Sequence, residues 1–160
     1  DSPVNEEEVI TTVTTTLTGG GQVITLTSRD LDGEGPNAPT ITVSGNLTAN
    51  TTYAGEVLFL NETVSPADNI TLEVEEEGVD HQVFYQLPAA LGTVTYTDVD
   101  LNGKPIGLAF TLTTGNAGTG NLTVTLRHLP NKSASGVASG DITNAGGATD
   151  ASVTYPVTIN

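Results

Sequence analysis

The sequence predicts an all-β protein, specifically an antiparallel β-sandwich of the Ig-like or Greek-key type with about ten short strands. Three observations lead to this prediction. Apolar and Thr side chains alternate with a period of two from Val9 to Ile159. Thr, a β-branched residue that disfavours helices, takes the place of many larger apolar residues. Turn-forming Gly, Asn and Pro residues interrupt the alternation at short intervals.

The expected strands follow one another along the whole chain. They cover residues 9–17, 24–28, 40–44, 53–61, 70–75, 81–86, 93–98, 106–114, 120–129 and 151–159. The first two are joined by Gly19-Gly20-Gly21, which predicts a hairpin. Residues 67–78 are the one segment that could hold a short helix, but the alternation of Ile70, Leu72 and Val74 favours a strand.

The 160 residues suit one domain of ordinary size, which we expect over residues 9–160, after an acidic tether at residues 1–8. The sequence begins with Asp1, and we expect a signal segment to have been removed from an exported protein. We therefore predict a location outside the cell or on its outer surface. No apolar run is long enough for a transmembrane segment, and there is no Cys for disulfides or thiolate metal sites.

The formal net charge is −15, from 19 acidic and four basic residues. The basic residues are scattered, so a phosphate backbone would be repelled and nucleic acid is not an expected partner. Divalent cations and basic surfaces are the partners that this charge favours.

The last expected strand carries Pro156 on the face opposite to its apolar residues. Because proline cannot donate a backbone hydrogen bond, we expect this strand at a sheet edge, where a second chain could pair with it. The candidates for such strand pairing, including donor-strand complementation, are Val9, Thr11, Val13, Val153, Tyr155 and Val157.

Two acidic loops match the start of a calcium-binding D-x-[DN]-x-[DN]-G loop, in which alternate oxygens converge on one cation. The candidate ligands are Asp30, Asp32 and Glu34 in the first loop, and Asp98, Asp100 and Asn102 in the second. Neither loop has a carboxylate at its twelfth position, where Ile41 and Ala109 stand. A solvated turn explains the same residues and is the interpretation we weigh higher. Ca²⁺ is the only cofactor that these loops suggest.

The two histidines are candidates for a transition-metal site. His81 is in phase with Val83 and Tyr85 after a run of acidic residues, and His128 is in phase with the apolar residues of its own strand. If the two strands are neighbours, both rings and a carboxylate could bind one ion. The alternative, two unrelated histidines with local hydrogen bonds, is favoured by their spacing of 47 residues, which fits no metal motif.

Six N-x-[ST] sequons are candidates for glycosylation in an exported protein. They begin at Asn46, Asn50, Asn61, Asn69, Asn121 and Asn131. Enzymatic motifs are lacking: there is no G-x-S-x-G elbow, and nothing places two carboxylates across a cleft. We therefore expect no catalytic residues, and a hydrolase is the least favoured function.

Seven segments resemble a family of exported lipoprotein domains common in flavobacteria, often labelled "type 1 periplasmic binding fold". They are EEVITTVTTTLT, DLDGEGPNAP, LTANTTYAGEVLFLNET, DHQVFYQ, DVDLNGKPIGL, LTVTLRHLPNKSASGV and GDITNAGGATDASVTYPVTI, in order over nearly the whole chain. The label implies alternating β and α units, which this sequence lacks, so we expect an all-β fold. Members carry a lipobox Cys before the tether, and this chain has none. The resemblance assigns no role to the acidic-loop and histidine residues, which remain candidates.

Two functions follow from these observations. The first is a non-enzymatic, cell-surface structural module that associates with itself, as a filament or surface assembly, through terminal or edge strands, with Ca²⁺ and glycans as stabilisers. The alternative is a lipoprotein-like binding module that captures a metal ion or small ligand beside an outer-membrane transporter.

Overall fold

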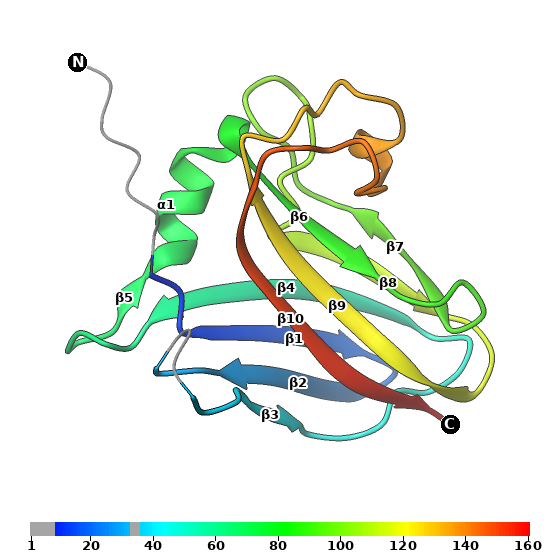
Figure 1. The fold of residues 1–160 in the computed structure, drawn as a ribbon. Coiled ribbons are helices and arrows are strands. Elements are labelled where there is room, and N and C mark those ends of the chain that lie inside the picture. The colour runs from blue at the N-terminus through cyan, green and yellow to red at the C-terminus, as the bar shows by residue number, and fades with distance from the viewer. Residues whose placement is uncertain (1–8, 33–35) are drawn as a thin grey trace, which may run out of the picture.

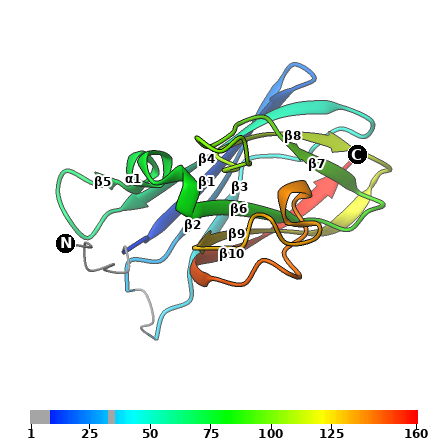
Figure 2. The same ribbon diagram turned by 90° about the horizontal axis from the view of Figure 1, so that it is seen from above.

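The computed structural model describes residues 9–32 and 36–160, and it confirms the all-β sandwich. Two antiparallel sheets pack face to face, one large and one small (Figure 1). Viewed from above, β6, β9 and β10 lie together on one side of the molecule and β1, β4 and β8 on the other (Figure 2).

The large sheet has seven strands within the described residues. They are β1 (Thr12–Gly19), β2 (Gln22–Arg29), β3 (Thr40–Val43), β4 (Thr52–Asn61), β5 (Asp68–Asn69), β7 (Gly92–Tyr96) and β8 (Ala109–Thr114). Their order is β3-β2-β1-β4-β8-β7, with β5 paired to β4. Three successive antiparallel strands followed by a fourth that returns beside the first form a Greek key, as the sequence predicted.

The small sheet has three strands, in the order β10-β9-β6. They are β6 (His81–Gln86), β9 (Gly118–His128) and β10 (Ala148–Ile159). The 3-10 turn η1 (Gly78–Asp80) leads into β6, and η2 (Val137–Ser139) lies between β9 and β10. The segment between β9 and β10 closes over the outer face of β6, where Val137 and Ala145 pack on buried Phe84.

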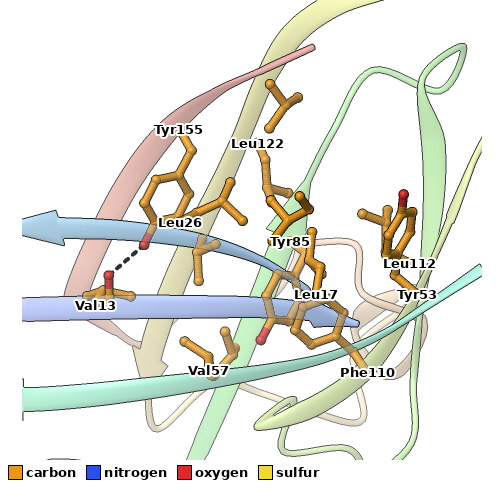
Figure 3. Close-up of a cluster of buried hydrophobic side chains, with 14 of the residues drawn as sticks. Val13, Leu17, Leu26, Tyr53, Val57, Tyr85, Phe110, Leu112, Leu122 and Tyr155 are labelled. Atoms are coloured by element: carbon orange, nitrogen blue, oxygen red, sulfur yellow. Dashed lines mark hydrogen bonds between the residues drawn. The ribbon is translucent and has the colours of Figure 1, made fainter. Parts of the chain in front are cut away.

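The core lies between the sheets and is built from the apolar side of the predicted alternation (Figure 3). The Tyr155 hydroxyl of β10 donates a 2.7 Å hydrogen bond to the Val13 carbonyl of β1, which ties the two sheets together. The rings of Tyr85 and Phe110 lie 4.0 Å apart across the core. Gly55 leaves room for Phe110, because a Cβ there would stand 2.3 Å from the ring.

The strand predicted over residues 70–75 is wrong, since this segment forms the helix α1 (Ile70–Glu76). The Asn69 side chain accepts a hydrogen bond from the Thr71 amide and caps the helix N-terminus. Ile70 and Val74, four residues apart, face the core, while Leu72 is 60% exposed. Three apolar residues at alternate positions also fit a helix in which only the first and the third face the core, so the sequence pattern could not separate the two structures.

The two terminal strands differ in their surroundings. β1 pairs with β2 on one side and β4 on the other, so the predicted pairing candidates Thr11 and Val13 have no free strand edge. β10 pairs with β9 alone, except for a parallel bridge between Ile159 and Leu47. The prediction that Pro156 marks an edge strand is confirmed.

No helix within residues 9–32 and 36–160 has the length and apolar character that crossing a membrane requires.

Candidate metal centre

The two histidines predicted as metal ligands meet at one end of the small sheet. β6 and β9 pair in a register that sets His81 directly opposite His128. Both side chains follow the core-facing phase of their strands, and their ring centroids lie 4.7 Å apart. The condition stated from the sequence, that the two strands be neighbours, is fulfilled.

The carboxylate of the site comes from Asp150 on β10, which the sequence did not single out. Its Oδ2 lies 3.7 Å from His81 Nε2 and 3.5 Å from His128 Nδ1. The β10–β9 register shifts between Thr149 and Ala151, so Asp150 is the extra residue of a β-bulge. A bulge reverses the side-chain phase of a strand, and here it turns Asp150 towards the histidines. Strict alternation would have placed this residue with Pro156 on the opposite face.

All three side chains are shielded from water. Their side-chain exposures are 2% for His81, 14% for His128 and 6% for Asp150. A buried carboxylate requires a positive partner, because its solvation by water has been lost. A protonated histidine or a bound cation would supply that charge.

The backbone fixes which nitrogen of His81 faces the carboxylate. His81 Nδ1 lies 3.0 Å from the Glu77 carbonyl oxygen, which can only accept, so Nδ1 carries a proton. In the neutral ring, Nε2 then presents a lone pair on the side of Asp150, as a metal ligand must. A carbonyl behind a ligating histidine is the usual outer contact of such sites.

Without a metal, the same groups favour a proton. Burial acts to lower the pKa of His81, but the hydrogen bonds with Asp150 and the Glu77 carbonyl and the charges of both acidic residues outweigh it. The pKa of His81 is therefore raised above its ordinary value of 6.5. A metal ion would have to displace this proton, so metal affinity should weaken as the solution becomes more acidic.

The ligand atoms are close to the spacing of a single coordination sphere. One atom from each of the three residues lies within 4.8 Å of the others. Metal–nitrogen bonds of about 2.0–2.1 Å in a tetrahedral site place ligand atoms about 3.3 Å apart. The two distances to Asp150, 3.7 and 3.5 Å, are near this value. Two imidazoles and one carboxylate suit zinc, cobalt, nickel or copper rather than calcium.

The second predicted calcium loop has protein partners for both of its carboxylates. Asp98 accepts hydrogen bonds from the Gly107 and Leu108 amides, at 2.8 Å each. Asp100 accepts from the Asn102 amide at 2.8 Å and forms a buried 2.9 Å ion pair with Lys132. The Lys132 ammonium thus stands where a cation would be needed. Calcium binding by this loop stays a prediction, which the geometry does not favour.

In the first predicted calcium loop, Glu34 lies outside the described residues. The Asp32 carboxylate accepts a 3.1 Å hydrogen bond from the Asn37 amide. Hydrogen bonding with Asp30 and Asn37 lowers the pKa of Asp32, although it is exposed. Such contacts are typical of a tight turn, and calcium binding here also stays a prediction.

The six sequon asparagines lie on the surface to different degrees. Those that are exposed are Asn46, Asn50, Asn121 and Asn131. Asn61 and Asn69 are half-buried and use their side-chain oxygens locally, Asn61 towards Thr63 and Asn69 at the cap of α1. Glycosylation stays a prediction, and the exposed four are the accessible acceptors.

Comparison of the chain with protein-family models, with curated proteins and with solved structures gives no match. The resemblance to exported lipoprotein domains therefore stays a prediction.

Proposed function

We propose that the domain is a binding module for one divalent transition-metal ion, and that it is not an enzyme. The observation that carries the proposal is the convergence of His81, His128 and Asp150 from three neighbouring strands. Their shielding leaves little room for a substrate beside the ion. The expected location outside the cell remains part of the proposal.

The ion would also join the three strands of the small sheet. His81 lies on β6, His128 on β9 and Asp150 on β10, so each strand supplies one ligand. A ligand that binds only the folded chain stabilises it by mass action, by about 2.7 kcal/mol at a free concentration one hundred times its Kd. Metal uptake should therefore be visible in thermal unfolding as well as in binding.

The test is titration of metal-free protein with Co²⁺ and Zn²⁺. We expect Co²⁺ to give visible absorption bands of a low-symmetry site, and Zn²⁺ to displace them and raise the Tm. His128→Gln and Asp150→Asn should each abolish both effects. Asp80→Asn removes an exposed carboxylate next to His81 and should change neither. Absence of uptake by the folded parent protein at neutral pH would refute the proposal.

Self-association through β10 is the second candidate function, because most of this strand has a neighbour on one side only. The bulge at Asp150 and Pro156 interrupt the edge and confine continuous pairing to residues 151–155. Sedimentation velocity over a wide concentration range tests it. A monomer at every concentration, and no filaments by electron microscopy, would exclude it.

A further inference from the structure

A separate cleft lies between α1 and η1 on one side and the segment 97–108 on the other, over β4. Its volume is about 500 Å³. This is within the range of about 300–1,000 Å³ typical of ligand sites. We propose that this cleft binds a segment of another polypeptide that carries both basic and apolar side chains.

The charge of the cleft selects for a cation. Glu56 of β4 and Glu75 and Glu76 of α1 line it with exposed carboxylates, and none of the described residues lining it is basic. Lys132, which contacts the lining residue Asp100, is neutralised by it. An anionic or neutral ligand would gain nothing from these groups, whereas Lys and Arg side chains would.

The rim of the cleft selects for an apolar group as well. Leu101 is 96% exposed, Val99 is 65% exposed and Val79 is 40% exposed. All three line the same cleft as the carboxylates. Apolar side chains exposed to water beside charged groups are characteristic of protein interaction sites, and a bare metal ion or a hydrophilic cation would leave them exposed.

The loop that carries these apolar residues is fastened to the body. Asp100 accepts hydrogen bonds from the Asn102 amide at 2.8 Å and the Lys104 amide at 3.0 Å. Lys132 donates to the Gly78 and Pro105 carbonyls, at 2.7 and 2.8 Å, and so ties the loop to η1. A loop fixed in this way holds its exposed side chains in place, and its preorganisation reduces the entropy lost on binding.

The experiment is fluorescence polarisation with a labelled twelve-residue peptide that alternates Lys and Leu. A Lys/Ser peptide of equal charge and a Glu/Leu peptide serve as comparators. We expect the Lys/Leu peptide to bind most tightly. Leu101→Ser should weaken it by about fivefold or more, and Glu75→Gln with Glu76→Gln by about tenfold. Circular dichroism would establish that each variant is folded.

Matched control variants separate the cleft from the overall negative charge. Val23→Ser removes an apolar side chain that is 63% exposed on β2, and Asp68→Asn with Asp141→Asn removes two exposed charges elsewhere. These should leave peptide affinity within about twofold of the parent protein. The proposal would be overturned if the Lys/Ser peptide bound as tightly as the Lys/Leu peptide, or if the control variants lost as much affinity as the cleft variants. Full displacement of the Lys/Leu peptide by spermine, which has no apolar side chains, would overturn it as well.

Discussion

Two of the clusters that the structure describes are built around a carboxylate shielded from water, and they differ in where the positive charge comes from. Around Asp100, the chain itself provides the cation, since Lys132 Nζ lies 2.9 Å from the carboxylate and also donates to two carbonyls. Around Asp150, the described neighbours within ion-pair distance are the two imidazoles of His81 and His128. These carry a charge only when protonated.

The Asp100 cluster is therefore structural, whereas the Asp150 cluster is a site that can exchange its cation with the solution. Lys132 is covalently part of the chain, so Asp100 needs no cation from the solution to balance its charge. Asp150 depends on what the solution supplies, a proton or a metal ion. The contrast predicts that substitution destabilises the Asp100 cluster more than the Asp150 cluster, and that added metal affects only the Asp150 cluster.

The largest expected effect is that of Lys132→Met. It leaves Asp100 buried without its cation, and breaking a buried pair in this way costs about 3–5 kcal/mol. Urea titration of the parent and the variant measures the loss. Lys104→Met, which replaces a half-buried lysine in the loop that carries Asp100, should cost much less. A loss below about 1 kcal/mol for Lys132→Met would remove the contrast between the clusters.

A smaller effect is expected for Asp150→Asn in the presence of a chelator. The amide still offers an oxygen to His81, so we expect a loss of about 1–2 kcal/mol in the free energy of unfolding. Added Zn²⁺ should increase the difference in the free energy of unfolding between the parent protein and the variant, because only the parent protein gains stability from the ion. Urea titrations with and without Zn²⁺ give both quantities. A stability difference that Zn²⁺ does not change would show that this cluster binds no metal ion.

Acid should weaken the Asp100 cluster. Burial acts to raise the pKa of Asp100, but the hydrogen bonds from Lys132, Lys104 and Asn102 outweigh it and hold the pKa below 3.8. A depressed folded-state pKa gives stability that is present above the ordinary value and lost as the pH falls through the folded one. The stability difference between the parent and Lys132→Met should therefore narrow as the pH drops below 3.8. A difference that stays constant in acid would contradict this account.

The smallest effect is expected at the exposed ion pair of Arg29 and Glu62. Its atoms lie 3.0 Å apart, almost as close as those of Lys132 and Asp100, but the Arg29 side chain is 53% exposed. Water and salt screen such a pair, so Arg29→Gln should leave the urea midpoint unchanged within error. A loss comparable to that of Lys132→Met would show that burial is not what distinguishes the two pairs.

Much of the fold could be predicted because one physical signal runs through the chain. Val13, Leu17, Leu122 and Tyr155 all lie on the core side of the alternation, and all are buried. The signal failed at residues 70–75, where a cap at Asn69 and apolar residues four apart form a short helix instead. Local periodicity cannot separate the two structures over so few residues.

The metal centre could be predicted in part. The phases of His81 and His128 were visible in the sequence, but their pairing depends on the order of strands in the small sheet. Asp150 could not be found by alternation, since the bulge that turns it inward leaves no certain mark in the sequence. The role of Lys132 was missed for a related reason, because only the packing of η1 against the 97–108 segment brings its partners together.

The bulge at Asp150 also has an evolutionary consequence. Because one surplus residue sets the side-chain phase, the loss of a single codon at Thr149 could restore regular alternation and turn Asp150 towards solvent. The sandwich, with its core contacts further along β10, would be retained. A lineage could thus lose or regain the third ligand by a one-residue deletion or insertion, without altering either histidine.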